Sequence, residues 1–379
     1  MKVIEAISDT NIGGAGRLLL TRLKNSNTKE IQTEVILPKD SRLKERFDDI
    51  GVRTHCIDGC RDRSLDLRAV KDISRVIKET EPDIVNAHGC MSARISAWLC
   101  GVPVRIYTRH CAYPVPRVLS TPPIKQMVGF GGMMLSNAAI AVAYAAKEDL
   151  LKMGFFESRI RVIINGVDPL RRYTEAERKA ARAELGLEGR FVVGISARLE
   201  RCKDHECFLR GARILLRDDD RYRFMIIGEG SERERLRQLA GALGIEDKVI
   251  FTGFVDDVEK YMNCLDLNVN CSVGTETSSL ALSEGMSLGL PAVASSYGGN
   301  PYMVRHGENG FIYSKGDPTE LAKMISRISS DAILYEKMSR AALERYAIEL
   351  NSAQMTENTE SFYKELCQEH VKVLNSETE

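Results

Sequence analysis

The chain has 379 residues, of which 44% are hydrophobic and 28% are charged. This length exceeds what one hydrophobic core usually supports, so we expect two folded domains and exclude a fibrous or disordered chain. Its 53 basic residues are balanced by 53 acidic ones. Because a chain without net charge has no overall attraction to phosphate backbones, nucleic acid is not an expected partner.

Cysteine usage and the N-terminus predict a cytoplasmic protein. The ten cysteines are scattered without the spacing of a zinc site or a disulfide framework. The N-terminus shows no secretion signal, and no run reaches the roughly 20 apolar residues of a membrane span. The most apolar stretch, 127–146, is interrupted by glycines and polar residues, so it is predicted to form a helix, a turn and a buried strand.

Short apolar runs alternate with amphipathic stretches, which is typical of parallel sheets covered by helices. In the first half, strands are predicted at 2–7, 33–37, 52–57, 83–87, 104–107, 139–142 and 161–163. In the second half, they are predicted at 191–195, 223–227, 248–251, 267–270 and 291–294. The fold class is therefore α/β, with two doubly wound, Rossmann-like domains whose strand ends can face each other across a cleft.

The two series are separated by a turn at 165–169 and a charged stretch at 171–182, where we place the domain linker. The first domain is expected to cover 1–168 and the second 169–350. The remaining residues, 351–379, are expected to form a helix that crosses back to the first domain.

Glycines follow the first predicted strand, in the segment 9–17 that contains Gly13, Gly14 and Arg17. Backbone N–H groups can approach a ligand closely at such a turn, and a helix N-terminus favours anions. The spacing differs from the dinucleotide-binding motif G-x-G-x-x-G. A tight turn with close helix–sheet packing explains the glycines equally well.

Arg198 and Lys203 lie on a loop after the first strand of the second series. Arginine offers a planar pair of donors and lysine a compact charge, so together they can hold a diphosphate. Because Glu200 and Asp204 are close in sequence, a solvated charged loop is the alternative.

Two carboxylates, Glu276 and Glu284, follow the strand predicted at 267–270. A helix that begins near Ser279 would place Glu276 in the preceding loop and Glu284 inside the helix. The amides of Ser279 and Leu280 would then be donors at a helix N-terminus, suited to phosphate. In the alternative, a serine simply caps the helix and both carboxylates face solvent.

His88 and His110 each follow or end an apolar strand, which makes them candidates for a ligand cleft, although a lone histidine is often structural. The remaining histidines lack supporting context. No group of histidine, cysteine and carboxylate residues has metal-ligand spacing, so no metal site is predicted.

In this order, the motifs resemble the retaining nucleotide-sugar glycosyltransferases of the glycogen-synthase-like GT-B group, called family four. The resemblance covers nearly the whole chain. Its motifs are Gly13, Gly14 and Arg17; 82–88; 165–168; Arg198 and Lys203; 227–230; 251–254; Glu276 and Glu284; 289–291; Gly298 and Gly299; and 306–311.

The resemblance implies a donor-binding second domain. Arg198 and Lys203 would bind the donor diphosphate and stabilise the leaving group, Glu284 would bind the ribose and Glu276 the donor sugar. The amides of Ser279 and Leu280, with Gly230, would complete the donor site.

The first domain is implied to bind the acceptor. His110 would face the donor sugar and act in catalysis with Arg198, Lys203 and Glu276. Gly14 would lie beneath donor and acceptor, and Gly13, Arg17 and His88 would belong to the acceptor side of the cleft.

The implied activity is a retaining hexosyltransferase that uses a nucleoside-diphosphate sugar, with UDP favoured, and no metal ion or other cofactor. The implied acceptor is a lipid-linked or cell-surface polysaccharide precursor. Peripheral association with the inner face of the cytoplasmic membrane would fit the cations and apolar residues at Arg105, Arg109, Arg117, Lys125, 127–130 and 133–135, although core packing with a few surface cations explains them too.

Two departures from the family concern the identity of the donor sugar. Thr277, Ser278 and Ser279 follow Glu276 where the family often has an aromatic residue, and Tyr302 stands where glutamate is usual. A non-catalytic nucleotide-sugar-binding protein and a GT-B nucleotide-sugar epimerase are the alternative functions.

Overall fold

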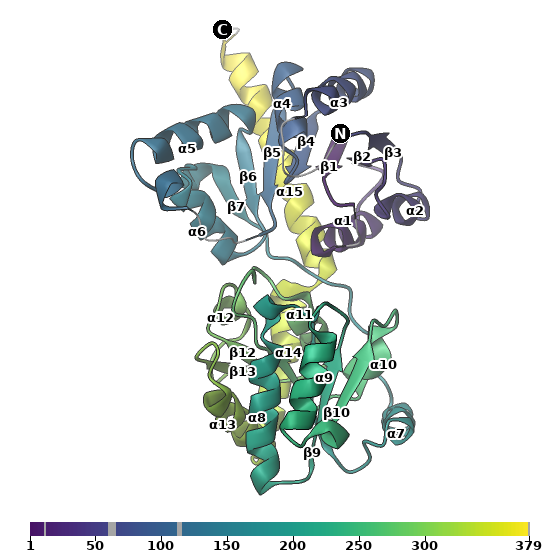
Figure 1. Cartoon of the computed structure of the whole chain (residues 1–379). Coiled ribbons are helices and arrows are strands. Elements are labelled where there is room, and N and C mark those ends of the chain that lie inside the picture. Colours follow the sequence, from purple (N-terminus) through teal and green to yellow (C-terminus); the bar gives the residue numbers. More distant parts are fainter. Residues whose placement is uncertain (11–12, 60–65, 112–115, 378–379) are drawn as a thin grey trace. The chain divides into compact units, whose positions relative to one another are not determined.

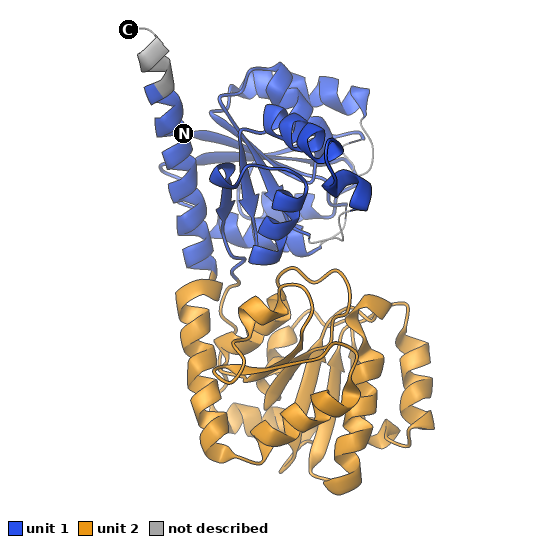
Figure 2. Cartoon of the chain, turned by 90° about the vertical axis from the view of Figure 1, so that its left-hand side faces the viewer, with its two compact units in different colours: residues 1–166, 352–379 blue, residues 167–351 orange. Residues whose placement is uncertain are grey.

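The computed structural model describes residues 1–10, 13–59, 66–111 and 116–377, which form two compact units (Figures 1 and 2). Unit 1 comprises Met1–Gly166 and Ser352–Glu379, and unit 2 comprises Val167–Asn351. The unit boundary after Gly166 compares with a predicted boundary after residue 168. Residues 11–12 of the predicted glycine loop lie outside the described residues.

Unit 1 contains a seven-stranded parallel sheet in the order β3-β2-β1-β4-β5-β6-β7. The chain extends the sheet in one direction from β1 and in the other from β4, so the strand order reverses between β1 and β4. The strands are β1 (Lys2–Ile7), β2 (Gln32–Pro38), β3 (Thr54–Ile57), β4 (Ile84–His88), β5 (Val104–Arg109), β6 (Ala138–Ala141) and β7 (Ile160–Val162).

Helices cover both faces of this sheet, because alternate residues of its strands pack in opposite directions. Ile4 and Ala6 of β1 pack with α3 and α4, whereas Ile7 packs with α1 and α2. The helices of unit 1 are α1 (Gly14–Lys24), α2 (Leu43–Asp48), α3 (Leu67–Thr80), α4 (Met91–Leu99), η1 (Arg117–Ser120), α5 (Ile124–Leu135), α6 (Tyr144–Lys152), η2 (Glu157–Arg159) and α15 (Ser352–Glu377).

Unit 2 repeats this plan with six parallel strands in the order β10-β9-β8-β11-β12-β13. The strands are β8 (Phe191–Ser196), β9 (Tyr222–Ile227), β10 (Val249–Gly253), β11 (Leu267–Asn270), β12 (Ala292–Ser295) and β13 (Gly310–Tyr313). The helices are α7 (Glu175–Glu184), η3 (Arg201–Lys203), α8 (His205–Asp218), α9 (Arg233–Ala242), η4 (Glu246–Lys248), α10 (Val258–Asn263), α11 (Leu280–Ser287), α12 (Asn300–Met303), α13 (Pro318–Ser329), α14 (Ala332–Arg345) and the π-helical turn η5 (Tyr346–Leu350).

Every predicted strand overlaps an observed one, and the stretch 127–146 forms the end of α5 followed by β6 as expected. Strand β13 was not predicted, since it is short and begins at a glycine. The charged stretch 171–182, interpreted as a linker, instead contains most of α7. Its Arg178 and Arg182 both bind Asp266, at 2.6 and 2.7 Å, which docks this polar helix on unit 2.

Helix α15 belongs to unit 1 although its residues are the last in the chain (Figure 2). Glu360 accepts hydrogen bonds from Ser26 Oγ at 2.6 Å and from Asn27 N at 3.0 Å. Glu365 pairs with Arg161 at 2.7 Å. These contacts attach the helix to both halves of the unit 1 sheet.

All cysteines in the described ranges are free thiols. No helix in those ranges combines the length and the apolar character that crossing a bilayer requires.

Candidate active site

In unit 2 the strand order reverses between β8 and β11, which pair directly. Arg198 and Lys203 follow β8, while Glu276 and Glu284 follow β11. Open parallel sheets bind ligands at the carboxyl ends of the strands beside such a reversal. The fold therefore brings the two predicted donor-site loops to neighbouring positions.

Glu276 is buried and accepts three hydrogen bonds. The donors are Ser272 Oγ at 2.7 Å, Lys203 Nζ at 2.8 Å and Asn270 Nδ2 at 3.1 Å. All three reach Oε2, so within the described residues Oε1 has no hydrogen-bond partner. The carboxylate is fixed in direction and keeps one acceptor oxygen for a ligand.

The backbone around Glu276 is held in an unusual conformation. Thr275 has a φ of 48°, a left-handed value that is costly for a β-branched residue and that occurs mostly at functional sites. Gly299 N donates to Glu276 O at 3.0 Å. A Cβ at Gly299 would lie 1.8 Å from Thr277 O, so only glycine permits this approach.

Lys203 ends the turn η3 and is mostly buried, with its ammonium bound to Glu276. The same two loops are joined through their backbones, because Val273 N and Gly274 N donate to Cys202 O at 2.9 and 3.2 Å. An ammonium has three N–H donors, and in the described chain Glu276 accepts from only one of them. Lys203 can therefore bind an anion without leaving Glu276.

Arg198 differs from Lys203 in its surroundings. Its side chain is 72% exposed and pairs with Glu200 at 2.8 Å, as the solvated-loop alternative expects. An exposed ion pair contributes only about 0–1 kcal/mol, so it holds the guanidinium weakly. Arg198 can turn toward a ligand at little cost.

Helix α11 begins at Leu280 and is capped by Ser279, whose hydroxyl accepts from Leu282 N at 3.3 Å, as predicted. Both Glu276 and Glu284 are buried, so the alternative in which both face solvent is wrong. The amide of Ser279 donates to the sulfur of Met303 at 3.1 Å, and thioether sulfur is a weak acceptor. A phosphate oxygen could replace that sulfur.

Gly230 follows β9, and its position is set by packing on the Arg198 loop. A Cβ at Gly230 would lie 2.4 Å from Leu199 O. The two loops are joined by hydrogen bonds from Leu199 N to Glu229 O at 2.9 Å and from Glu232 N to Leu199 O at 3.0 Å. Gly230 therefore supports the Arg198 loop through close backbone contact.

In unit 1, the predicted glycine loop leads into α1 at the reversal between β1 and β4. Gly13 precedes the helix and accepts from Arg17 N at 3.0 Å, while Gly14 begins it on the exposed surface. The close packing anticipated in the tight-turn alternative falls on Gly16, where a Cβ would lie 2.5 Å from Leu43 Cδ1. Arg17 is exposed.

His88 and His110 contact each other at this reversal. His88 Nδ1 lies 2.6 Å from His110 Nε2, and the rings stack with centroids 4.9 Å apart. His88 Nε2 lies 2.7 Å from Glu5 Oε2. Burial, and then the neighbouring His88, hold the pKa of His110 well below its usual range.

Glu5 is fully buried in β1 and also binds Arg22 of α1 and the hydroxyl of Tyr363 of α15, the latter at 2.8 Å. Burial alone would raise the pKa of Glu5, but Arg22, His88 and Tyr363 together lower it to about 2. Asn86 of β4 donates to Tyr363 Oη at 2.8 Å. The carboxylate is thus ionised and bound on both oxygens.

Several of these residues were not identified from the sequence. Glu5 interrupts an otherwise apolar strand, which is a usable signal for a buried, partnered charge. Asn270 and Ser272, which bind Glu276, are polar residues at the end of a buried strand. Tyr363 lies far along the chain in a polar helix and carries no such signal.

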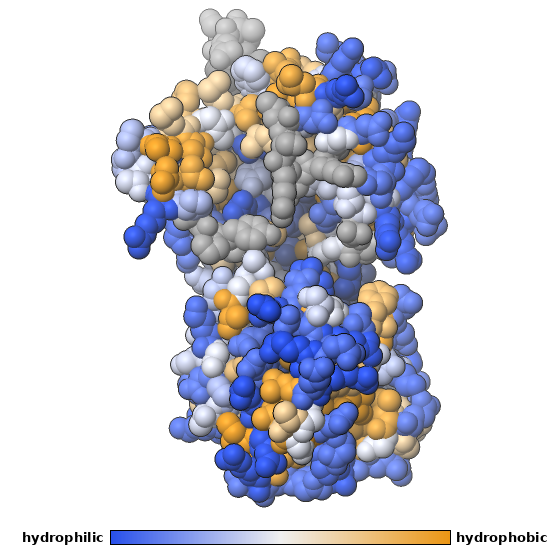
Figure 3. Space-filling model, viewed as in Figure 1, coloured by the Kyte–Doolittle hydropathy of each residue, from blue (hydrophilic) through white to orange (hydrophobic). Residues whose placement is uncertain are grey.

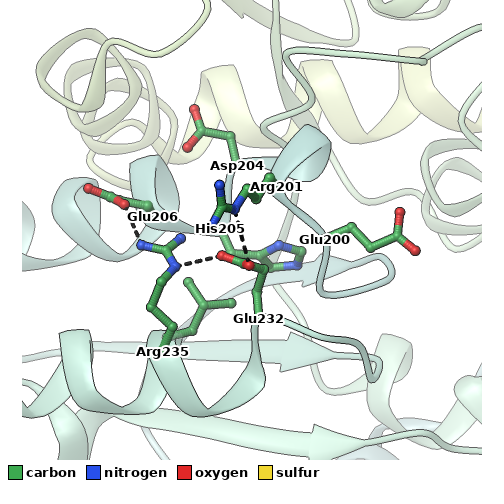
Figure 4. Close-up of a pocket in the computed structure, with 8 residues that line it drawn as sticks. Glu200, Arg201, Asp204, His205, Glu206, Glu232 and Arg235 are labelled. Carbon is green, nitrogen blue, oxygen red and sulfur yellow. Dashed lines mark hydrogen bonds and ion pairs between the residues drawn. The ribbon is translucent and has the colours of Figure 1, made fainter.

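A cavity of about 340 Å³ lies beside the Arg198 loop, lined by charged side chains of α8, α9 and the loop 200–204 (Figure 4). Arg235 binds Glu206 and Glu232 across it, at 2.7 and 2.5 Å. His205 is buried there, and neither ring nitrogen has a hydrogen-bond partner among the described residues. Burial, and then the charge of Lys203, lower the pKa of His205 to about 4.

No group of three or more metal-ligating side chains is present among the described residues. The site in unit 2 instead combines a mostly buried lysine, an exposed arginine and a helix N-terminus with two buried carboxylates. Cations and backbone amides of this kind bind phosphates, and carboxylates bind sugar hydroxyls.

Family models match both units of the chain. The model described as Glycosyltransferase Family 4 matches residues 12–171, and the model described as Glycosyl transferases group 1 matches residues 177–345. Together they cover most of the chain.

Two relatives are similar over most of their length. The N-acetyl-alpha-D-glucosaminyl L-malate synthase of Bacillus anthracis is 24% identical over 79% of this chain and 78% of its own. The UDP-Gal:alpha-D-GlcNAc-diphosphoundecaprenol alpha-1,3-galactosyltransferase of Escherichia coli is 25% identical over 85% of this chain and 86% of its own.

Solved structures share the fold. Anabaena Alr3699/HepE in complex with UDP matches with a TM-score of 0.84 and 21% identity, over 96% of this chain and 100% of that one. The lipopolysaccharide outer core galactosyltransferase WaaB matches with a TM-score of 0.72 and 19% identity, over 96% of this chain and 100% of that one. These matches confirm the predicted fold class, two doubly wound α/β domains of the GT-B type.

Proposed function

Because the chain belongs to family four of the glycosyltransferases, with a group 1 domain in unit 2, we propose that it moves a sugar from a UDP-sugar to a lipid-linked or cell-surface polysaccharide precursor. The anomeric configuration is retained in this proposal. The observation that best supports the proposal is the Lys203–Glu276 pair at the β8–β11 reversal. The Escherichia coli relative is named for a UDP-galactose donor and a diphosphoundecaprenol-linked acceptor, and the HepE structure contains UDP.

Lys203 and Arg198 bind the donor diphosphate in this proposal. Departure of the nucleoside diphosphate leaves an oxocarbenium-like sugar, and the main task is to stabilise negative charge on the leaving group. Lys203 is already fixed by Glu276, whereas Arg198 has to exchange Glu200 for phosphate. The amides of Ser279 and Leu280, at the start of α11, add donors for the phosphates.

The two carboxylates bind hydroxyls. Glu276 Oε1 lacks a partner within the described residues, so it can accept a hydrogen bond from the donor sugar. Glu284 is buried in the second turn of α11 and is assigned to the ribose. Gly230 supports the Arg198 loop from the side of β9.

For retention, we propose that the acceptor attacks from the same face that the leaving phosphate occupies, with that phosphate assisting removal of the acceptor proton. His110 is assigned to the donor sugar and Gly14 to the floor beneath donor and acceptor. Gly13, Arg17 and His88 belong to the acceptor side. No metal ion is needed in this proposal, because two cations and the α11 amides neutralise the leaving group.

Helix α5 supports peripheral binding to the inner face of the cytoplasmic membrane. Two of its glycines face inward: a Cβ at Gly129 would lie 2.1 Å from Gly154 O, and one at Gly132 would lie 2.6 Å from Phe155 Cζ. Its large apolar residues therefore face outward and form the apolar patch visible in Figure 3. The exposed members are Val118, Ile124, Met127, Phe130 and Met134.

One of the four cations predicted for this surface lies elsewhere, since Arg109 binds Tyr107 and Asp149. Arg105 donates to Val102 O at 2.7 Å and also reaches Met134 O at the end of α5, at 3.5 Å. Arg117 and Lys125 remain beside the apolar patch. An apolar patch with adjacent cations suits a surface of anionic lipid.

Vesicle sedimentation tests this part of the proposal. Wild-type protein should bind vesicles that contain anionic lipid more than neutral ones, and the Met127→Ser, Phe130→Ser double variant should lose binding. As a control, Ile333→Ser removes an equally exposed apolar residue of unit 2 and should have no effect. Equal vesicle binding by all three proteins would contradict the proposed membrane association through α5.

The donor assignment is tested with a panel of UDP- and GDP-sugars. A UDP-sugar should raise the melting temperature in proportion to its affinity. Slow release of UDP from that sugar without acceptor distinguishes a transferase from a non-catalytic binding protein, and recovery of the unaltered hexose distinguishes it from an epimerase. Stabilisation by no nucleotide sugar would contradict the proposed function.

A further inference from the structure

Glu5 is a fully buried carboxylate in the middle of an apolar strand. Burying a charge is costly unless it is paired and hydrogen-bonded. Arg22 and Tyr363 both bind Oε1, and His88 binds Oε2. The side chain therefore has a defined orientation: Arg22 neutralises the charge at Oε1, and His88 forms a hydrogen bond with Oε2.

The hydrogen-bond roles along this chain follow from Glu5. An ionised carboxylate only accepts, so His88 must donate to it from Nε2. In neutral His88, Nδ1 then has a lone pair, and His110 must donate to it from Nε2. The remaining nitrogen of His110, Nδ1, is consequently an acceptor.

The charge balance of the cluster supports neutral histidines. Glu5 is matched by Arg22, so a proton on either ring would add an uncompensated positive charge beside the buried His88. This agrees with the depressed pKa of His110. Within the described residues, His110 Nδ1 has no hydrogen-bond partner.

We propose that Glu5 and His88 are positioning residues that hold the His110 ring in place and keep it in the Nε2–H tautomer, so that Nδ1 accepts a hydrogen bond from a hydroxyl of the bound substrate. This rests on the proposed function, which assigns His110 to the donor sugar. The site thus extends from one histidine to a hydrogen-bonded chain of Glu5, His88 and His110, called the relay below, that starts inside β1. Tyr363 of α15 binds the first member of this relay.

Nuclear magnetic resonance of the protein labelled with ¹⁵N-histidine tests the tautomer without any activity assay. The six histidines are assigned by single substitutions. In wild type, His110 should show a protonated Nε2 and an unprotonated Nδ1. A protonated Nδ1 in wild type at neutral pH would overturn the proposal.

Glu5→Gln gives this measurement a second arm. Arg22 and Tyr363 are both donors to Oε1, so the amide oxygen should take that place and the amide NH₂ should face His88. His88 would then accept at Nε2 and donate from Nδ1, which switches His110 to the Nδ1–H tautomer. An unchanged tautomer in a folded Glu5→Gln variant would contradict the relay.

A double-mutant cycle tests whether His88 acts through His110. His88→Leu removes the acceptor and should lower the rate of donor hydrolysis about 10- to 100-fold, because the His110 ring loses its fixed orientation. His88→Gln can still donate to Glu5 and accept from His110, so it should recover most of the rate. In a His110→Ala background, His88→Leu should have almost no further effect.

The controls separate positioning from stability. His55→Gln removes another histidine–glutamate contact of unit 1, with Glu34, and should leave the rate unchanged. The same fold-loss for His88→Leu with and without His110 would overturn the proposal. If no donor is hydrolysed by wild type, the proposed function fails, while the tautomer measurement still decides the relay.

Discussion

Units 1 and 2 place charged residues at the same topological position but at different depths. In unit 2 the charges lie on the loops after β8 and β11, where Arg198 is exposed and Lys203 joins one loop to the other. In unit 1 the charge is Glu5, inside β1, and it reaches the strand ends only through His88. At the reversal in unit 2 the exposed Arg198 can change partners, whereas at the reversal in unit 1 the charged group is fixed before any ligand binds.

The difference indicates separate tasks. A donor diphosphate brings its own charge, so Arg198 needs freedom to exchange Glu200 for a phosphate, whereas Lys203 can bind the anion without leaving Glu276. A histidine that accepts a hydrogen bond from a neutral hydroxyl needs a defined tautomer and orientation. Substitutions of the buried charge in unit 1 should therefore affect mainly stability, and substitutions of the cations in unit 2 mainly turnover.

The largest expected effect is on the stability of unit 1. Glu5→Leu leaves Arg22 buried without its partner and should lower the free energy of unfolding by about 3–5 kcal/mol. Urea unfolding followed by the fluorescence of Trp98, the single tryptophan and a residue of α4 in unit 1, measures it. The partly exposed Glu34, replaced by leucine, is the control and should cost less than about 1 kcal/mol. Equal losses of stability in the Glu5 and Glu34 variants would contradict the structural role of the buried Glu5–Arg22 pair.

The pH dependence of Glu5 has a definite sign. Its pKa falls from 4.5 in the unfolded chain to about 2 in the folded one, so its contribution is complete above pH 4.5 and is lost as the pH falls toward 2. Glu5→Leu should flatten the stability of unit 1 across this window.

The next effect is on turnover in unit 2. Lys203→Ala should lower donor turnover by about 10²-fold or more, because a fixed cation at the leaving group is lost. Arg201→Ala, in the same turn, is the matched control, since that side chain is 87% exposed and pairs with Glu232. Wild-type turnover in Lys203→Ala would end the diphosphate assignment.

Arg198→Ala sharpens the contrast between the units. Turnover should again fall about 10²-fold, whereas the melting temperature should stay close to wild type, because its exposed pair with Glu200 contributes little. A large loss of stability would show that Arg198 is structural.

A smaller effect concerns His205, in the cavity beside the Arg198 loop. Its folded pKa of about 4 lies below the ordinary 6.5, so the unfolded chain binds more protons and stability falls as the pH drops from 6.5 to 4. The loss is at most about 3 kcal/mol.

His205→Leu should remove this pH dependence. Because it also removes two unpaired nitrogens, it should stabilise unit 2 by about 1–2 kcal/mol at pH 7. Hydrogen exchange of the backbone amides of β8 and β9 measures the stability of unit 2. An unchanged pH dependence of that stability in His205→Leu would contradict the prediction.

The smallest expected effect is on donor affinity. Glu284→Ala should weaken UDP-sugar binding about ten-fold by removing one charged acceptor. Calorimetry measures it, with Glu308→Ala of the exposed surface as control. Unchanged affinity would remove Glu284 from the ribose assignment.

The apolar runs determined the two sheets, because strands buried on both faces must be apolar throughout. The helix start near Ser279 also followed from a local pattern, since capping depends on neighbouring residues. Strand β13 and helix α7 were missed, because a short edge strand and a polar docked helix take their stability from partners distant in sequence.

By itself the sequence determined which loops carry Arg198, Lys203, Glu276 and Glu284, since each follows a strand and the ends of parallel strands share one side of a sheet. Only the tertiary structure decided that Lys203 binds Glu276, that Arg198 turns to Glu200, and that Glu5, His88 and His110 form one chain. Such contacts join residues up to hundreds of positions apart, as from Glu5 to Tyr363. Their geometry depends on how strands and helices pack, which no local pattern specifies.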